Sequence, residues 1–287
     1  ALHMGHMYKK GKNMLFSIVI VSLNPGDKLK KTVDSVIQQS YQDIQILVKD
    51  GMSRDGSVEA LEKIYGGHSK LEIVRKPDGS IYEGMNQAVE LVKGEYVLFL
   101  NCGDTFYDNE VLKRTAEIIK ERRQKEPPAI FYGDTYCEKT QAAVHSAPEI
   151  TGFTCYRNIP CHQSCFYDRR LFTAHPYETA FRIRADYEHF LWCYYEAHAE
   201  MIYMDERVSS YEGGGYSESK ENRRRDKEEH KKITKRYMSS LELWKYRMLM
   251  AVSLAPLRRV LAENRLTGSV YNWLKTKVYQ RRTGKEV

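Results

Sequence analysis

Hydrophobic and polar residues alternate in blocks along the first half of the chain. Residues 16–22 form a continuous run of apolar and β-branched side chains, which is typical of a strand buried on both faces. Similar runs at 44–48, 71–74 and 96–100 predict three more strands, and a shorter one is expected at 130–132. The first half is therefore predicted to supply the strands of one sheet.

Between these strands, apolar residues recur every three or four positions, which is the spacing of an amphipathic helix. The expected helices are one that Asp27 caps and that runs to Ile37, one that Asp55 caps before Val58, Leu61 and Ile64, one at 81–92 closed by Gly94, and one at 111–123. This alternation predicts an α/β fold, with a mostly parallel sheet and helices on both faces. In such a sheet, ligands bind beyond the carboxyl ends of the strands, which singles out Asn24, Asp50 and residues 101–104.

The second half of the chain has a less regular pattern. It predicts short strands and turns at 134–165, a helix at 186–197, a strand at 201–204, a glycine loop at 213–215 and a polar helix at 218–237. Residues 241–261 are amphipathic, and a broad apolar side is expected to hold Leu243, Trp244, Met248, Val252 and Leu257.

The composition, with 42% hydrophobic and 29% charged residues, excludes collagen-like, low-complexity and wholly disordered chains. No apolar run approaches the roughly 20 residues that span a bilayer, and the first residues lack the apolar core of a signal peptide. We interpret residues 1–14 as an expression-tag remnant and a leader. The six cysteines lack the spacing of an extracellular disulfide framework, so we expect reduced thiols in a cytosolic protein.

Charge is distributed unevenly around a net +7. Residues 220–287 hold 19 Lys and Arg against 7 Asp and Glu, a net +12, whereas residues 1–219 hold 26 against 31, a net −5. A basic tail suits an anionic partner such as lipid headgroups, lipid-linked phosphates or nucleic acid. A solvated helical surface is the alternative explanation.

Two aspartates, Asp50 and Asp104, follow predicted strands and suit a nucleotide site. One carboxylate can accept hydrogen bonds from a base or ribose, and the other can hold a divalent cation that bridges two phosphates. Either aspartate taken alone could be a turn or capping residue, but the pair in these positions favours the nucleotide.

Several motifs together resemble those of family 2 glycosyltransferases, which have the GT-A (Rossmann-like) fold. The motifs are FSIVIVSLN at 16–24, ILVKDGMSRDGS at 46–57 and KPDGSIYEGMNQAVELVKGEYVLFLNCGDTF at 76–106. They are similar to those of bacterial enzymes that assemble capsule, exopolysaccharide or O-antigen repeat units. The resemblance, over residues 15–215, implies a catalytic domain at 15–217 with a nucleotide-binding half (15–133) and an acceptor half (134–217), followed by a basic helical tail at 218–287.

The resemblance implies roles for five residues in binding the nucleotide-sugar. Ser22 and Asn24 would line the nucleotide pocket, and Asp50 would contact the uracil or ribose. Asp78 would lie near the base, and Asn86 would support the site for the sugar donor.

The resemblance also implies a metal site. Asp104 would hold Mn²⁺ or Mg²⁺, with Asn101 among the nucleotide-binding residues. The family's usual motif is Asp-x-Asp, whereas residues 101–104 are Asn-Cys-Gly-Asp, so one carboxylate of the motif is present. A related subgroup uses an Asn-x-Gly-Asp form, so an active enzyme is still expected.

In the second half, CHQSCF at 161–166 resembles the family's His-Gln segment at the back of the active site. The resemblance implies that His162 and Gln163 contact substrate, with His162 hydrogen-bonded to a phosphate or an acceptor hydroxyl. A structural histidine is the alternative. A zinc site at Cys161, His162 and Cys165 is disfavoured, because no second group of ligands has a matching spacing.

Asp186, within RIRADYEHF at 182–190, resembles the family's catalytic acidic position. An inverting transfer needs a carboxylate that takes the proton from the acceptor hydroxyl, so Asp186 would be the general base. The alternative is a helix N-cap, which is compatible with the catalytic role. Glu188 is the weaker candidate, because two residues further along a helix it points elsewhere.

The last quarter of the chain suggests how the protein meets its acceptor. GGGYS at 213–217 resembles the family's Gly-Gly-x-Ser loop, which implies that Gly214 and Ser217 help to close over the sugar donor; a flexible linker is the alternative. Basic clusters interleaved with Trp and Tyr suit peripheral binding to the inner membrane face. No nucleic-acid-binding signature is present, and the stripe at 241–261 would also allow a homo-oligomer.

We therefore expect an inverting glycosyltransferase in the cytoplasm, peripheral on the inner face of the membrane. It would move a sugar from a nucleotide-sugar, UDP-linked, to a saccharide carried on a polyprenyl diphosphate. A non-catalytic nucleotide-sugar-binding or membrane-scaffold protein on the same fold is the alternative. A nucleotidyltransferase is a third option, but SLNPGDKLKK at 22–31 is a poor version of its Gly-rich signature.

Overall fold

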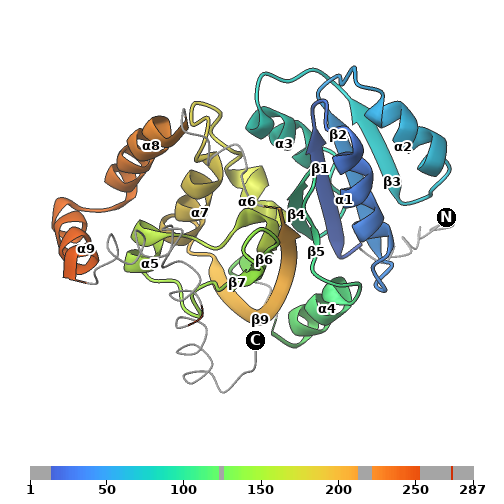
Figure 1. Cartoon of the computed structure of the whole chain (residues 1–287). Helices are drawn as coiled ribbons and strands as arrows, with labels where there is room; N and C mark the ends of the chain where they lie inside the picture. Colours follow the sequence, from blue (N-terminus) through green and yellow to red (C-terminus); the bar gives the residue numbers. More distant parts are fainter. Residues whose placement is uncertain (1–13, 123–125, 213–221, 253–272, 274–287) are drawn as a thin grey trace, which may run out of the picture. The chain divides into compact units, whose positions relative to one another are not determined.

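A computed structural model describes residues 14–122, 126–212, 222–252 and 273 of the chain (Figure 1). Within these residues the strands form a nine-stranded sheet in the order β3-β2-β1-β4-β8-β6-β9-β5, with β7 paired to β6. The strands are β1 (Phe16–Ser22), β2 (Ile44–Asp50), β3 (Leu71–Arg75), β4 (Tyr96–Asn101), β5 (Thr105–Phe106), β6 (Ala129–Cys137), β7 (Ala142–Val144), β8 (Cys165–Asp168) and β9 (Glu200–Tyr211).

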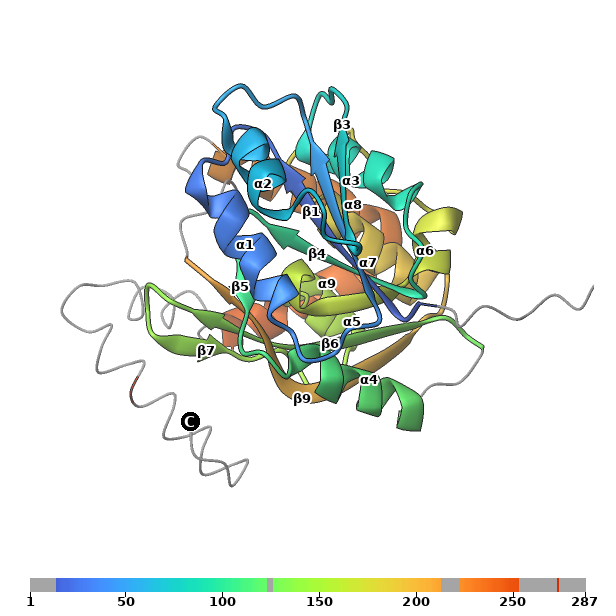
Figure 2. The same ribbon diagram turned by 90° about the vertical axis from the view of Figure 1, so that its right-hand side faces the viewer.

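The helices lie between these strands and after the last one. They are α1 (Asp27–Ile37), α2 (Ser57–Tyr65), α3 (Ile81–Val89), α4 (Val111–Arg122), α5 (Gly152–Arg157), α6 (Arg169–Ala174), α7 (Ala185–Tyr195), α8 (Asn222–Tyr237) and α9 (Ser240–Val252), together with the 3₁₀ turn η1 (His162–Ser164). Figure 2 shows α1 and α2 on one face of the sheet and α3, α6 and α7 on the other. The predicted α/β fold with helices on both faces is confirmed.

The first half of the sheet is parallel, as predicted. Strand β1 pairs in parallel with β2 on one side and with β4 on the other, and β2 pairs in parallel with β3. The register places Ser22 opposite Asp50, and Val21 opposite Asn101, so the carboxyl ends of three strands meet at one edge. The second half is mixed, because β8 runs antiparallel to both β4 and β6 whereas β6 and β9 are parallel.

Two predicted helix caps are wrong. The N-cap of α1 is Gly26, with φ +58°, and Asp27 is the first helical residue. The N-cap of α2 is Gly56, with φ +80°, but the Asp55 carboxylate still accepts hydrogen bonds from the N–H groups of Ser57 (3.1 Å) and Gly26 (2.8 Å). Asp55 thus ties the loop after β1 to the start of α2, and glycine takes each cap because the backbone is left-handed there.

The predicted end of α3 at Gly94 is also wrong, since the helix ends at Val89. The side chain of Gln45 on β2 forms hydrogen bonds with peptide groups that follow the helix. Its Nε2 donates to Leu91 O (3.1 Å), and its Oε1 accepts from Lys93 N–H (2.9 Å). Gly94 has a different role, because its N–H donates to Ser17 Oγ (2.8 Å) where the chain passes close to β1.

Strand β9 is longer than the predicted strand at 201–204. Its second half is rich in polar residues, so it lacks the apolar pattern of a buried strand. Ser209 and Ser210 are nevertheless buried, because the Ser209 hydroxyl hydrogen-bonds to Ser164 Oγ (2.7 Å) and Ser210 Oγ donates to Glu138 (3.0 Å). Hydrogen-bonded serines can occupy core positions that a hydrophobic pattern does not identify.

The chain divides into two compact units. The first contains the described residues of 1–150 and 159–230, and the second contains 151–158 and those from 231 onward. In the second unit the ring of Tyr246 on α9 contacts those of Phe153 (5.7 Å between centroids) and Tyr156 (5.6 Å) on α5. Because the first unit extends to His230, the first turns of α8 belong to the same unit as the sheet. The predicted domain boundary at 217/218 stays a prediction.

Two further observations concern the cysteines and the hydrophobicity of the helices. All six cysteines lie in the described part of the chain, and none forms a disulfide. Among the described helices, none combines the length and the hydrophobicity needed to cross a membrane.

The close approach at Gly94 leads to a prediction of stability. A Cβ on Gly94 would lie 2.5 Å from the backbone atoms Phe16 C and Ser17 N, which belong to the buried strand β1. We expect Gly94→Ala to lower the free energy of unfolding by about 2 kcal/mol or more, because backbone must move to relieve the overlap. Urea denaturation measures it. Gly67→Ala is the control, since a Cβ there meets nothing within 4 Å; equal stability of the two variants would contradict the prediction.

Candidate active site

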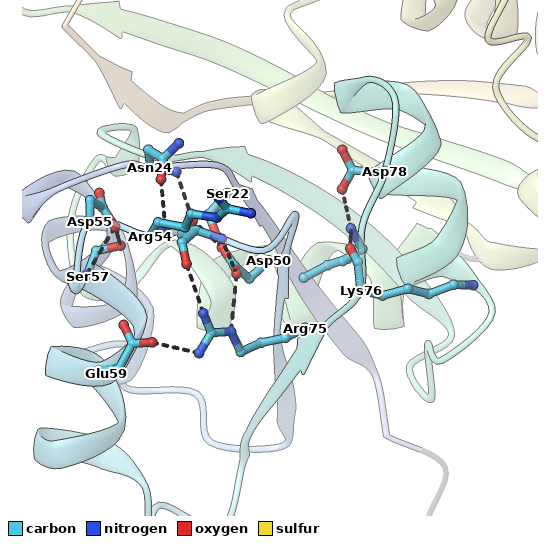
Figure 3. Close-up of polar contacts among 12 residues, drawn as sticks. Ser22, Asn24, Asp50, Arg54, Asp55, Ser57, Glu59, Arg75, Lys76 and Asp78 are labelled. Atoms are coloured by element: carbon cyan, nitrogen blue, oxygen red, sulfur yellow. Dashed lines mark hydrogen bonds and ion pairs between the residues drawn. The ribbon is translucent and has the colours of Figure 1, made fainter.

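Asp50 braces the loops at the carboxyl ends of β1 and β2 (Figure 3). Its carboxylate accepts hydrogen bonds from Ser22 Oγ (3.0 Å), from Ser53 N–H (2.8 Å) and from Ser53 Oγ (2.5 Å). The Arg75 Nε atom lies 3.5 Å from Asp50 Oδ2, and Asp50 is fully buried. A nucleoside can therefore reach this carboxylate only if Ser53 or Arg75 moves aside.

Asn24 fastens the same two loops from the solvent side. Its N–H donates to Ser53 Oγ (2.8 Å), and its Oδ1 accepts from Arg54 N–H (2.8 Å). Asn24 has φ +49° and Met52 has φ +72°, so both loops contain a left-handed residue that these bonds hold in place. The structure thus brings Ser22, Asn24 and Asp50 together, with Asn24 and Arg54 exposed at the surface.

Arg75 is a site residue that the sequence reasoning missed. From the end of β3, its Nη1 pairs with Glu59 on α2 (2.7 Å) and its Nη2 donates to Ser53 O (2.9 Å) (Figure 3). The available signal was an arginine at the carboxyl end of a predicted strand. Arg75 supplies the positive charge that offsets the buried Asp50 carboxylate.

Asp78 lies beside the end of β2. It forms an ion pair with Lys49, whose buried ammonium group also donates to Lys76 O (2.7 Å). A Cβ on Gly51 or Gly84 would lie 3.0 or 3.1 Å from Asp78 Oδ2, so both glycines leave space for this carboxylate. Lys49 was missed, although a lysine in an apolar strand is unusual and signals a buried partner.

Asp104 ends the turn that follows β4. Thr32 Oγ1 on α1 donates to Asp104 O (2.8 Å) and accepts from the N–H of Gly103 (2.9 Å), which has φ +103°. Burial raises the pKa of Asp104 to about 6, although the nearby His162 and a hydrogen bond from Asn101 act in the opposite direction. The ionised carboxylate is therefore poorly solvated here, and a cation would stabilise it.

The residues of this turn fit a divalent cation. The Oδ1 atom of Asn101 is buried without a hydrogen-bond partner, and Asp104 adds a carboxylate beside it. Both are hard oxygen ligands, and Mg²⁺-type ions use one or two protein ligands plus phosphate oxygens of the substrate. In the described part of the chain, no cluster of three or more His, Cys, Asp or Glu is arranged to hold a metal by itself.

His162 connects this turn to the predicted base. Its Nε2 lies 3.1 Å from Asn101 Nδ2, and its Nδ1 lies 3.4 Å from Asp186 Oδ2. The amide nitrogen of Asn101 is a donor, so Nε2 accepts and the imidazole proton resides on Nδ1, where it faces Asp186. His162 thus orients a carboxylate while keeping contact with β4.

Asp186 is held in an ionised state. Its Oδ1 accepts hydrogen bonds from Tyr82 OH (2.9 Å) and Tyr187 N–H (2.9 Å). Burial raises the pKa of Asp186, but the hydrogen bonds from His162 and Tyr82 act in the opposite direction, and the pKa is lowered overall. The N-cap of α7 is Arg184, so the alternative that Asp186 is the cap is wrong.

Helix α3 fixes the chain that leads to Asp186. Asn86 forms two hydrogen bonds with the backbone of Tyr177: Nδ2 donates to Tyr177 O (2.8 Å), and Oδ1 accepts from Tyr177 N–H (2.9 Å). Tyr82 lies one turn earlier and was missed, although its spacing of four residues from Asn86 places both on one face. Asn86 therefore ties the backbone at Tyr177 to α3.

The other predicted residues have different outcomes. Glu188 is fully buried and pairs with His175 (3.0 Å), so it is unsuited to meet a substrate. Gln163 is buried in η1 beside His162. Gly214 and Ser217 lie outside the described residues.

Comparisons with known proteins agree with this architecture. The family described as "Glycosyl transferase family 2" matches residues 17–166. A "PGL/p-HBAD biosynthesis glycosyltransferase" of Mycobacterium bovis is 34% identical over 207 residues, which are 71% of this chain and 79% of that protein. A chondroitin synthase of Pasteurella multocida is 30% identical over 108 residues, which are 38% of this chain and 11% of the synthase.

Solved structures share the fold at low identity. Residues 1–349 of S. aureus TarS in complex with UDP have a TM-score of 0.57 at 16% identity, and the match covers 95% of this chain and 73% of that fragment. The mannosyltransferase PcManGT from Pyrobaculum calidifontis has a TM-score of 0.60 at 13% identity, covering 94% and 88% of the two chains. The expected GT-A fold is confirmed. The chain belongs to glycosyl transferase family 2, and it is a glycosyltransferase.

Proposed function

We propose that this glycosyltransferase transfers a sugar, with inversion, from a UDP-sugar to a lipid-linked saccharide in the assembly of a surface polysaccharide. The observation that carries the proposal is the connection from Asn101 through His162 to Asp186, which puts an ionised carboxylate next to the turn after β4. A non-catalytic scaffold on the same fold would have no use for a carboxylate held in this way.

Asp186 is the general base of the proposed reaction. Its Oδ1 is engaged by Tyr82 and Tyr187, which leaves Oδ2, beside His162, to take the proton of the acceptor hydroxyl. As that proton moves, the acceptor oxygen attacks the anomeric carbon, and the bond from this carbon to the nucleoside diphosphate breaks on the opposite face. The configuration at the anomeric carbon is thereby inverted, and the nucleoside diphosphate leaves with the electron pair of the broken bond.

The leaving diphosphate needs positive charge at the same edge of the sheet. Lys28 and Lys31 on α1 both pair with Glu212 (2.8 and 3.1 Å), and Lys31 lowers the pKa of Asp104. Asp104 and Asn101 would hold Mn²⁺ or Mg²⁺, which would neutralise charge on the diphosphate. PcManGT, which shares the fold, has been solved with GDP-Man and Mn²⁺.

The choice of UDP follows from one fold relative that has been solved in two complexes. TarS has been solved with UDP and with UDP-GlcNAc. In this chain the exposed Asn24 and Arg54 and the nearby Asp78 are the polar groups at the ends of β1, β2 and β3, where a nucleoside would lie. Asp50 then shapes the pocket through Ser22 and Ser53.

A membrane surface is the proposed setting of the acceptor. Helix α9 buries Leu243 and Tyr246, whereas Leu241, Trp244, Met248 and Val252 form an exposed stripe along the other side. Lys245 and Arg247 are exposed on either flank of this stripe. An apolar stripe with an interfacial Trp and flanking cations suits an anionic lipid surface, where a lipid-linked saccharide would be presented.

Calorimetry with UDP tests the donor site. We expect Mn²⁺ to increase the affinity of the wild type for UDP. Asp104→Ala should lose that increase, because the variant lacks the carboxylate that we propose as a ligand of the metal ion. Glu110→Gln, at a half-buried carboxylate beyond the same turn that pairs with Lys113, is the control and should behave like the wild type. UDP binding that ignores both Mn²⁺ and the variant would refute the metal site, and absence of UDP binding would refute the UDP-sugar donor.

The base assignment is tested with Asp186→Asn. The amide keeps the size of the side chain but cannot take the proton, so we expect transfer to slow by about 10²–10⁴-fold while UDP affinity stays the same. Turnover of radiolabelled UDP-sugars on lipid-linked acceptors measures it. Glu196→Gln, at the exposed end of α7, is the control. Normal turnover of Asp186→Asn would contradict the assignment of Asp186 as the general base.

Vesicle sedimentation tests the membrane surface. We expect the full chain to bind vesicles that contain phosphatidylglycerol, and Trp244→Glu to weaken binding roughly tenfold or more, since a large apolar side chain no longer enters the bilayer. Ile64→Glu on α2 is the control, because Ile64 is similarly exposed outside the stripe. Unchanged binding of Trp244→Glu would contradict the proposal, and a concentration-dependent dimer that the same variant dissociates would point to a second copy as the partner.

A further inference from the structure

The backbone just before Asp186 is held by one buried carboxylate. The N–H group of Arg182 donates to Glu229 Oε1, and those of Ile183 and Arg184 donate to Oε2, each over 3.0 Å. Glu229 lies on α8, far along the sequence, and it is 6% exposed. Three backbone donors around one carboxylate offset the desolvation of its charge, because hydrogen bonds to an ionised group are strong.

A second carboxylate of α8 holds the same segment. Asp226, almost one helical turn before Glu229, pairs with Arg184: Oδ1 lies 2.7 Å from Nε, and Nη2 donates to Oδ2 (3.0 Å). On the other side, Arg182 Nη1 donates to Gly79 O (2.9 Å), next to the start of α3. The segment 182–184 is thereby fastened to α8 and to α3.

These contacts reach Asp186 through two routes. Along the chain, Asp186 follows Arg184 after one residue. Through space, Tyr82 OH lies 2.7 Å from Ile183 O and 2.9 Å from Asp186 Oδ1. The hydroxyl that orients Asp186 therefore also contacts the segment 182–184, which Glu229 binds. A displacement of 182–184 would therefore shift both the base and the group that orients it.

We propose that Glu229 and Asp226 are positioning residues, which set the place and orientation of Asp186 from helix α8. The proposal rests on the role of Asp186 given above, and it adds to that role a support from the segment 218–287, which the sequence assigned to a membrane tail. Both carboxylates and Asp186 belong to the same compact unit. The first turns of α8 thus serve catalysis, and the apolar stripe that suits a membrane begins on α9.

The acidic residues of α8 provide a matched set of variants. Glu229 and Asp226 face the segment 182–184, whereas Glu228 is exposed and pairs with Arg224 on the same helix (2.9 Å). We would compare Glu229→Gln, Glu229→Ala and Asp226→Asn with Glu228→Gln in the full-length protein. Glutamine keeps one acceptor oxygen, so it removes the charge with the least loss of packing.

The first expected result concerns turnover. We expect Glu229→Ala to lower kcat by about 100-fold, as a shift of about 1 Å in a catalytic group can do, and Glu229→Gln and Asp226→Asn to lower it less. UDP affinity and the KM for the sugar donor should stay unchanged, because the ends of β1 and β2 are not touched. Glu228→Gln should match the wild type.

The second expected result separates positioning from a general loss of stability. Asp186 owes its lowered pKa to His162 and Tyr82, so a displaced Asp186 has a higher pKa. In a plot of kcat against pH, the fall in kcat on the acidic side should therefore move to higher pH in Glu229→Gln. Glu228→Gln should keep the wild-type pH profile. Amide hydrogen exchange of a peptide containing 182–184 should become faster in Glu229→Gln with the rest of the sheet unchanged.

Three outcomes would overturn the proposal. One is a wild-type kcat and pH profile in both Glu229→Gln and Asp226→Asn. Another is a loss of kcat that runs parallel to losses of UDP affinity and melting temperature, which indicates a purely structural role. The third is unchanged amide exchange at 182–184. If the wild-type protein transfers no sugar at all, the proposed function fails, whereas the exchange experiment still decides whether Glu229 holds the segment.

Discussion

Parallel pairing of β1 with both β2 and β4 is the constraint on which the site depends. Because the side chains of parallel strands advance in step, the register that sets Ser22 opposite Asp50 also brings the end of β4 to the same edge. Loops that are distant in sequence then meet within hydrogen-bonding distance. Every polar contact described at this edge, from Asn24 to the turn at Asp104, depends on that register.

Three aspartates of the candidate site, Asp50, Asp104 and Asp186, have the same side chain and three different environments. Asp50 is buried under serine hydroxyls and an arginine and serves the shape of the loops. Asp104 is largely buried, and its hydrogen bonds and neighbouring charges do not offset the loss of hydration. Its pKa therefore rises to about 6, and a bound cation would stabilise the ionised carboxylate. Asp186 is surrounded by donors that keep it ionised. Environment, rather than residue type, therefore distinguishes the buried Asp50 carboxylate from the two carboxylates to which we assign metal binding and proton transfer.

The sequence predicted the first half of the fold well, because continuous apolar runs such as 16–22 have no stable place other than a buried strand. Through the family resemblance it also predicted roles for His162 and Asp186, whose side chains lie 3.4 Å apart in the structure. It missed Tyr82, Lys49, Arg75 and Glu229, since each acts on a partner that only the tertiary structure brings near. The end of α3 was wrong for the same reason: Gln45 on a neighbouring strand ends it.

The position of Glu229 changes how the basic tail is understood. A net charge of +12 over residues 220–287 averages over two kinds of surface, because α8 turns its acidic residues 226 and 229 toward the catalytic unit while its many cations stay outside. Net charge describes the outer surface and says nothing about the contacts that a few carboxylates make inside. In our proposal the same helix supports Asp186 through the buried Glu229 and the half-buried Asp226, and it still presents a basic surface to an anionic partner.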